Sequence, residues 1–150
     1  TTTVTTTTTP ELTTTVTTTT TPGASAQIQE IEIDAVNKIN QARTSAGYRT
    51  LKMDTTLCYC ADIRVKELQQ SYSVNRPDGS QYNTLLMNND APGWYQSYQY
   101  ANKNFTSADS FVAQLVRFFA KNPGQGINDP AFNNIGVGYD NGYWVVFFTV

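Results

Sequence analysis

The sequence predicts an α+β domain, an α-β-α sandwich in which three main helices flank a small antiparallel sheet. Three observations predict it. Apolar residues recur at helical spacing in three segments, 27–47, 57–72 and 108–121. The chain closes with two strand-like runs joined by an Asp-Asn-Gly turn, which indicates a hairpin. The last run is apolar on both faces, which is typical of a central strand covered on each side.

Residues 1–26 form a tract of Thr with a few Val and Pro, too poor in apolar side chains to build a core. We interpret 1–26 as a Thr-rich linker or stalk of an extracellular protein, and 27–150 as the folded domain. Because Thr and Val favour extended structure, we hypothesise that part of the tract docks on a groove or sheet edge, its own or a neighbour's. With no initiator Met and no signal peptide, we expect a mature product or an excised fragment.

The composition restricts the chemistry that the chain can perform. A net charge of −2 gives no reason to expect nucleic acid as a partner, and no apolar run is long enough to span a membrane. The chain has no His, which removes the usual general base and the commonest metal ligand. We therefore predict no catalytic residues, no metal and no cofactor.

The first helix is predicted over 27–47, with Gly47 placed to end it. Its apolar face is formed by Ile28, Ile31, Ile33, Val36, Ile39 and Ala42. Residues 51–53 are predicted to be a short extended link, after which Asp54 or Thr55 caps the next helix.

The second helix is predicted to run directly into an Arg-Pro-Asp-Gly turn. Its apolar stripe is formed by Leu57, Ala61, Val65, Leu68 and Tyr72. Pro77 and Gly79 are expected to stop the helix and form a tight turn around Asp78. Cys58 and Cys60 are two residues apart, so they point about 200° away from each other on a helix. We expect free, buried or half-buried thiols.

The remaining elements follow in order. Residues 81–88 are predicted to form a short helix, and the aromatic and amide-rich stretch 94–104 a loop with an extended piece. Ser107 is expected to cap the helix 108–121. Its inward side chains are predicted to be Phe111, Val112, Leu115, Phe118 and Phe119. Residues 135–139 and 143–150 are the two strands of the closing hairpin.

Several motifs in this order resemble a bacterial domain of the CAP superfamily: cysteine-rich secretory proteins, antigen 5 and pathogenesis-related proteins. They are the helix 37–43 with Gly47 and Leu51, the helix 57–67, the turn 75–80, the Asn-Pro-Gly-Gln turn 122–125, and the run 134–139 before a Tyr-Trp strand. The turn 75–80 resembles the superfamily's His-Arg-Pro-Asp-Gly loop, and 122–125 its Ser-Pro-Gly-His turn. The resemblance covers roughly residues 26–150 and implies the superfamily's SCP-like fold.

The resemblance also implies a cleft with two His and one or two acidic residues, which bind a divalent metal in some members. Here Asn75 and Gln125 stand in place of the two His, and Gln99 in place of the Glu of a Gly-Glu-Asn motif. Amides form hydrogen bonds but do not titrate near neutral pH, and they are poor zinc ligands. We therefore expect a cleft that keeps its shape without its metal or acid–base chemistry.

Glu67 and an aromatic cluster complete the candidate binding residues, which with the three amides are Asn75, Gln99, Gln125, Glu67, Trp94, Tyr98 and Tyr100. Aromatic rings with interleaved amides suit stacking on sugars or gripping an extended peptide. The alternative is that about half of these rings fill the core. Asn75 in turn suits a purely structural hydrogen bond to its own turn.

Three functions remain open. The first is a secreted or cell-surface, non-catalytic module that binds a peptide or cell-wall glycan through the cleft. The second is an assembly module whose Thr-rich tract docks on its own or a neighbouring domain, with further copies of the chain as partners that self-associate through the tract. The third, weaker without His, is a hydrolase that uses Glu67 and Asp78 or another carboxylate pair, which would need two carboxylates in a defined geometry.

Overall fold

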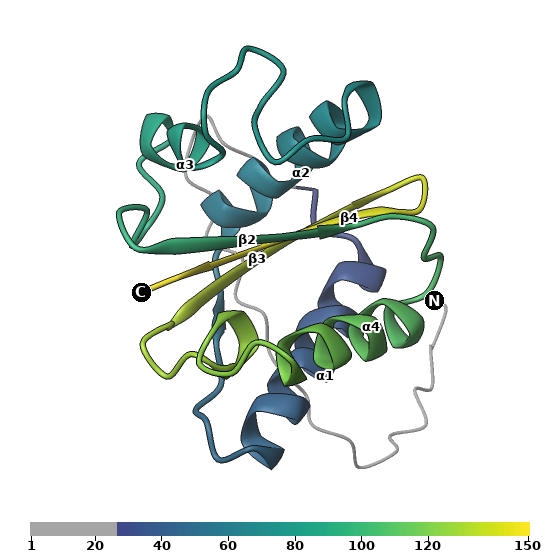
Figure 1. Cartoon of the computed structure of the whole chain (residues 1–150), viewed down its shortest axis with the longest axis vertical. Coiled ribbons are helices and arrows are strands. Elements are labelled where there is room, and N and C mark those ends of the chain that lie inside the picture. The colour runs from purple at the N-terminus through teal and green to yellow at the C-terminus, as the bar shows by residue number, and fades with distance from the viewer. Residues whose placement is uncertain (1–26) are drawn as a thin grey trace, which may run out of the picture.

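The computed structural model describes residues 27–150, which form three layers (Figure 1). The interpretation of residues 1–26 as a linker or stalk, and the hypothesis that they dock, fall on residues outside this range. The helices are α1 (Glu30–Ser45), α2 (Thr55–Gln70), α3 (Asn83–Asn88) and α4 (Ala108–Ala120), with a 3₁₀ turn η1 (Gly126–Asn128). The strands are β1 (Lys52–Met53), β2 (Ser97–Asn102), β3 (Asn134–Asp140) and β4 (Tyr143–Thr149).

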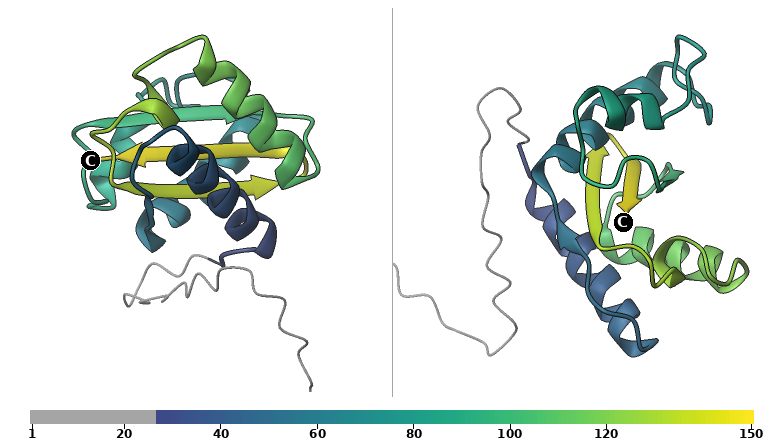
Figure 2. Two further views of the ribbon diagram at one scale, coloured as in Figure 1. Left: turned by 90° about the horizontal axis from the view of Figure 1, so that it is seen from below. Right: turned by 90° about the vertical axis from the view of Figure 1, so that its left-hand side faces the viewer.

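The predicted α+β class and sandwich architecture are confirmed. Helices α2 and α3 cover one face of the sheet, and α1 and α4 cover the other (Figures 1 and 2). The strand order is β1-β3-β4-β2. The sheet is mixed rather than antiparallel, because the two-residue strand β1 pairs parallel to β3 while β3–β4 and β4–β2 are antiparallel. The predicted extended link at 51–53 thus became an edge strand.

Strand β4 is central, as predicted, and its alternating side chains divide the core in two. Trp144, Val146 and Phe148 belong to the core beneath α1 and α4. Val145 and Phe147 belong to the core beneath α2. All five side chains are inaccessible to solvent, so β4 is the strand around which both layers pack.

Local signals place most element ends correctly. The Asp54 side chain accepts a hydrogen bond from the Leu57 N–H at 2.9 Å, and Ser107 caps α4 in the same way at 3.2 Å. Asn141 and Gly142 both have positive φ, the geometry of the tight hairpin turn that their sequence predicts.

Two predictions about helix faces are wrong. Helix α2 ends at Gln70, so Tyr72 lies beyond it and is 47% exposed rather than part of the buried stripe. The helix also does not run directly into the turn, because residues 71–75 separate the two. Phe118 was predicted to point inward, yet it is 37% exposed. Both rings line a groove at the edge of the sheet.

None of the helices within residues 27–150 combines the length and the apolar character that crossing a membrane requires.

Candidate functional site

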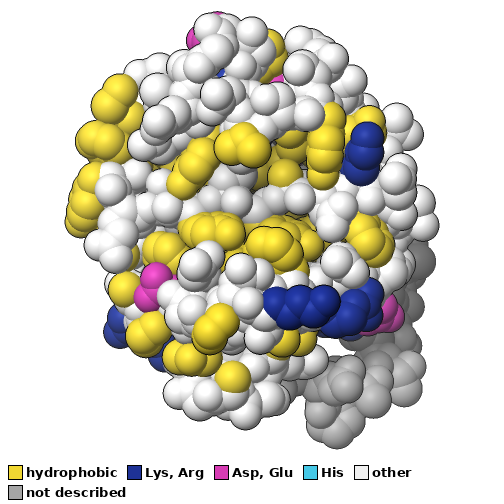
Figure 3. Space-filling view, viewed as in Figure 1, with side chains coloured by type: hydrophobic (Ala, Val, Ile, Leu, Met, Phe, Trp, Pro, Cys, Tyr) yellow, Lys and Arg dark blue, Asp and Glu magenta, His cyan; other side chains and the backbone are white. Residues whose placement is uncertain are grey.

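The candidate site is a groove of about 300 Å³ along the free edge of β2. Within residues 27–150, strand β2 pairs only with β4, so its other edge faces outward between the two helix layers. Figure 3 shows this side of the molecule, where apolar side chains gather in a hollow band along β2. The groove is lined by Leu68, Tyr72, Ser73, Val74, Tyr98, Gln99, Tyr100, Ala101 and Phe118.

The rim of the groove is apolar and accessible. Tyr72 and Val74 lie on the segment that follows α2, and Phe118 lies on α4 on the opposite side. Val74 is 77% exposed. The Lys103 ammonium lies 4.5 Å from the centre of the Tyr72 ring, a cation–π contact at the end of the groove. Large apolar side chains exposed together on one surface are typical of a binding site.

The floor of the groove is formed by β2 itself, and its two faces differ. Tyr98 and Tyr100 pack against Phe119 of α4, each with ring centres 5.5 Å apart, and Tyr100 also contacts Phe118 at 5.3 Å. Gln99 points to the other face of the sheet, where it meets Arg64 of α2. The groove therefore combines an aromatic wall with an amide whose side chain is already bonded.

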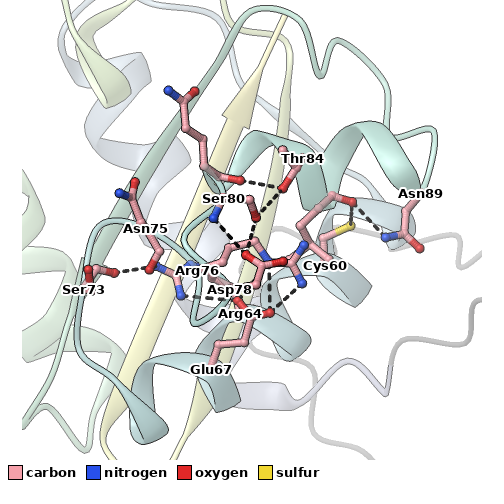
Figure 4. A network of polar contacts seen from close by, with 12 residues as sticks. Cys60, Arg64, Glu67, Ser73, Asn75, Arg76, Asp78, Ser80, Thr84 and Asn89 are labelled. Carbon is pink, nitrogen blue, oxygen red and sulfur yellow. Dashed lines mark hydrogen bonds and ion pairs between the residues drawn. The ribbon is translucent and has the colours of Figure 1, made fainter.

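Arg64 organises the α2 side of the groove, although it is fully buried. Its Nε donates to Gln99 Oε1 at 2.8 Å. Its Nη2 donates to the carbonyl oxygens of the segment after α2, those of Ser73 (2.5 Å), Val74 (3.1 Å) and Asn75 (3.3 Å). Figure 4 shows Arg64 beside Ser73 and Asn75. Arg64 thus joins the α2 wall of the groove, which includes Val74, to β2, the strand that forms the floor.

Glu67 completes the network by pairing with two arginines. Arg76 donates to Glu67 Oε1 from Nη2 at 2.6 Å and from Nε at 3.0 Å, and Arg64 Nη1 lies 3.4 Å from Glu67 Oε2. The hydrogen bonds that Arg76 donates to Glu67 are the main cause that raises the pKa of Arg76. A carboxylate held by two guanidinium groups is suited to a structural role, fixing the turn 76–80 to α2.

The turn 76–80 forms as its sequence predicts. The Arg76 N–H donates to the Ser80 carbonyl at 2.8 Å, and Gly79 has a φ of +87°. The Asp78 carboxylate accepts from the Ser80 hydroxyl and N–H, and these bonds lower its pKa. Both carboxylates of the hydrolase alternative therefore already accept hydrogen bonds from the protein, Glu67 from Arg76 and Asp78 from Ser80.

The structure brings some of the predicted binding residues together and separates others. Gln99 and Glu67 meet on Arg64, and Tyr98 and Tyr100 share the groove floor with Gln99. The Asn75 side chain is exposed beside the groove, and its carbonyl is held by Arg64. Gln125 is exposed before η1 and Trp94 packs beneath α2, both outside the lining of the groove.

The residue most important to the site's geometry, Arg64, was missed by sequence reasoning. It lies three residues after Ala61 and four before Leu68, so it interrupts the buried stripe at helical spacing. A cation within an apolar stripe is the signal that would have found it, because a buried guanidinium needs several acceptors nearby. Arg43 follows Ile39 on α1 in the same way and bonds the carbonyls of Arg49 and Ile127.

Strand β2 also offers backbone groups to the groove. The Gln96 carbonyl accepts a hydrogen bond from the Val150 N–H, and the direction of the backbone N–H and C=O groups alternates along an antiparallel pair. The backbone groups of Tyr98 and Tyr100 therefore point toward β4, and those of Gln99 and Ala101 point outward. The outward Ser97 carbonyl accepts from the Tyr82 hydroxyl at 2.9 Å, which agrees with this alternation. Within residues 27–150, the outward N–H and C=O groups of Gln99 and Ala101 have no protein partner.

A second hollow of about 220 Å³ lies away from β2, between α2 and the end of β3. Its lining includes Asp62 and Asp140, and the fully buried Glu32 lies nearby on α1. Glu32 Oε1 accepts from the Gln29 side chain (2.8 Å) and the Tyr139 N–H (3.3 Å). Burial, with the Asp62 carboxylate as a second cause, raises the pKa of Glu32 to about 8. Over 27–150, no three His, Cys, Asp or Glu side chains are grouped to hold a metal.

The fold and the groove define an α-β-α sandwich with an open edge strand, and the comparisons give its family. The model of the cysteine-rich secretory protein family (CAP) matches residues 36–150, so the chain belongs to the CAP family. No match was found among curated proteins.

Solved structures with the same fold come from three bacteria. An extracellular protein containing an SCP domain from Bacillus anthracis has a TM-score of 0.68 at 14% identity, over 79% of this chain and 39% of that one. A cysteine-rich secretory protein from Staphylococcus aureus has a TM-score of 0.66 at 15% identity, over 79% of this chain and 37% of that one. An outer surface protein from Borrelia burgdorferi has a TM-score of 0.62 at 14% identity, over 81% of this chain and 95% of that one. This chain thus spans less than two fifths of the first two proteins.

Proposed function

We propose that this CAP domain is a non-catalytic, secreted or cell-surface module that binds an extended peptide in the β2 groove. The observation that carries the proposal is the combination of an apolar rim with unpaired backbone groups along the groove floor, within residues 27–150. The extracellular and outer-surface descriptions of the structural neighbours support the location.

A peptide fits the groove better than a glycan does. An extended peptide brings a donor and an acceptor at every residue, which match the outward groups of Gln99 and Ala101. It also brings apolar side chains for the rim formed by Val74 and Phe118. A sugar has many hydroxyl groups to satisfy, whereas the one amide side chain on the floor, Gln99, is already bonded to Arg64.

The non-catalytic part of the proposal rests on the charged residues beside the groove. The carboxylate of Glu67 is ion-paired with Arg76, and the described residues that line the groove include no Asp, Glu, Lys or Arg. The chain has no His. General acid–base chemistry near neutral pH requires a group within reach of the ligand that titrates there. Burial raises the pKa of Tyr72, Tyr98 and Tyr100 in the groove further above neutrality, and Glu67 is held by its guanidinium partners.

Chemical-shift mapping tests this function on a full-length variant with Val16→Pro and Thr17→Pro, in which the chain's own Thr-rich tract is interrupted. A Thr- and Val-rich peptide is expected to shift the amide signals of Gln99, Ala101 and Val74, whereas cell-wall oligosaccharides at equal concentration are expected to leave them unchanged. Shifts caused by the oligosaccharide alone would overturn the peptide assignment.

Two variants on α4 form a matched pair for the same titration. Phe118→Ser removes a rim side chain, and we expect it to weaken peptide binding about tenfold. Val116→Ser changes a side chain of similar exposure, 38% against 37%, that lies outside the groove, and binding is expected to stay as in the unaltered chain. Equal effects of the two substitutions would contradict a binding site in this groove.

A further inference from the structure

We infer that the β2 groove receives the Pro-free segment 12–21 of the same chain, which adds as a parallel fifth strand beside β2, centred on Val16. This inference rests on the proposed function, since it assigns an occupant to the same groove. Its basis is the chemistry of the segment, the geometry of the sheet, and the length of chain that joins them.

The chemistry of the segment matches the groove. Residues 12–21 contain eight Thr with Leu12 and Val16, no Gly, no Pro and no charge. The β-branched side chains of Thr and Val favour strands, and alternate residues of a strand face the same side. Leu12 and Val16 therefore share one face. The described lining of the groove carries no charged residue, so an uncharged segment enters it without leaving a charge unpaired.

The backbone edge limits where the segment pairs. Because the Ser97 carbonyl is taken by Tyr82, the outward residues of β2 that keep both their N–H and C=O groups available within residues 27–150 are Gln99 and Ala101. These are four hydrogen-bonding groups within three residues, flanked by Val74 on one side and Phe118 on the other. An extended segment of about five residues satisfies all of them and covers the apolar rim.

The sheet register shows that the segment can reach this edge. The Gln29 side chain donates to the Tyr139 carbonyl at 2.8 Å, which fixes the start of the domain at the end of β3. Tyr139 pairs with Trp144, and Trp144 pairs with Asn102, so the last residue of β2 lies two strand spacings from Tyr139, about 10 Å. Position 99 lies about another 10 Å along β2.

The connecting chain is long enough for this path. Gln27 lies eleven positions after Val16, and an extended chain of eleven residue-to-residue steps spans up to about 36 Å. The path to position 99 requires about 20 Å along the sheet. The surplus allows the chain to pass around the β3–β4 hairpin. Because the segment is tethered at its Gln27 end, near Asn102, its direction is parallel to β2.

Hydrogen exchange of the Gln99 and Ala101 amides in the full chain tests the inference. A docked segment is expected to slow their exchange at least about tenfold relative to a variant with Val16→Pro and Thr17→Pro. Proline has no backbone N–H to donate. Because successive residues of a strand direct their N–H groups to opposite edges, two adjacent prolines remove the donor toward β2 in either register. A control variant with Thr6→Pro and Thr7→Pro, which lie on the N-terminal side of Pro10 and outside the docked segment, is expected to keep the slow amide exchange of the unaltered chain.

The same measurement separates the competing outcomes. Protection that is independent of protein concentration supports docking within one chain, whereas protection that is lost on dilution assigns the groove to a second copy and overturns the inference. Fast exchange in the full chain, or equal protection in all variants, also overturns it.

Adding a synthetic peptide Thr-Thr-Thr-Val-Thr-Thr-Thr to the Val16→Pro, Thr17→Pro variant distinguishes failure of the inference from failure of the proposed function. If the peptide protects Gln99 and Ala101 although the full chain shows no protection of its own, the groove binds peptides and only the inference fails. If the peptide has no effect on these amides, the proposed function fails as well.

Discussion

The Arg64 guanidinium donates to Gln99 Oε1 at 2.8 Å across 35 positions of the sequence, and it joins helix α2 to strand β2. The same side chain holds three consecutive carbonyls of the segment that carries Val74. One buried cation therefore determines how wide the groove is and which way its α2 wall faces.

Replacing Arg64 by Met is expected to lower the free energy of unfolding by about 3 kcal/mol, because several carbonyl acceptors and Gln99 lose a charged donor in a buried place. Urea denaturation measures the change. Lys66→Met, an exposed cation on the same helix, is the matched control and is expected to change stability by less than about 0.5 kcal/mol. Similar losses in the two variants would show that the network of Arg64 contributes little.

The buried Glu32 predicts a pH dependence of stability. Its pKa rises from 4.5 to about 8 in the folded chain, so the folded state keeps a proton that the unfolded state releases between these values. The free energy of unfolding is therefore greatest below pH 4.5 as far as this group is concerned. It falls as the pH rises toward 8, by at most about 1.4 kcal/mol per pH unit.

Glu32→Gln is expected to flatten this dependence between about pH 5 and 8, as measured by denaturant unfolding at a series of pH values. Asp62, whose pKa burial raises to about 6, adds a smaller slope of the same sign that stays in the variant. Glu30→Gln, the same change at an exposed position of α1, is expected to follow the unaltered chain. A slope in Glu32→Gln equal to that of the unaltered chain would contradict a protonated Glu32.

Gly138 brings strand β3 against helix α2. A Cβ added at Gly138 would lie 2.5 Å from the carbonyl carbon and oxygen of Ala61, which belong to the backbone of α2. We expect Gly138→Ala to lower the free energy of unfolding by about 3 kcal/mol, because the helix must move off the sheet.

Gly47→Ala serves as the comparison for Gly138→Ala. Gly47 has a φ of +86° with nothing within 4 Å of an added Cβ, so its substitution involves backbone strain alone. We expect a loss of about 1 kcal/mol there. Urea denaturation of both variants decides the matter, and a smaller loss at Gly138 than at Gly47 would contradict the close approach.

The two thiols are expected to be unreactive in the folded chain. Burial raises the pKa of Cys58 and of Cys60 to about 12, so neither is a thiolate near neutral pH. Mass spectrometry after treatment with iodoacetamide is expected to show modification only as fast as the chain unfolds, and complete modification in urea. Rapid alkylation of the native chain at either residue would show that the helix opens locally.

Much of the fold could be predicted from the sequence because its signals are local. Apolar spacing predicts α1, α2 and α4, and the Asp54 and Ser107 side chains mark helix starts. The turn at Asn141 predicts the hairpin, and the free thiols follow from the geometry of a helix. Each of these signals depends on residues within a few positions of one another.

The candidate site could be predicted only in part. Tyr98 and Tyr100 were singled out from the aromatic composition of their stretch and Gln99 from the family resemblance, and all three line the groove. Phe118 was assigned to the core, because periodicity shows which residues share a helix face but not where the covering layer ends. Trp94 and Gln125 were included for their residue types, and the structure places them outside the groove lining.

The sequence by itself determined the class of fold, the order of its elements and the absence of His. The tertiary structure alone decided that β2 is an edge strand of the sheet within residues 27–150, that Arg64 is buried, and that Val74 and Phe118 line the same groove. The physical reason is that these features depend on pairings between distant residues, such as Gln99 with Arg64 and Tyr98 with Phe148. Local propensity carries no information about which strand is left without a neighbour.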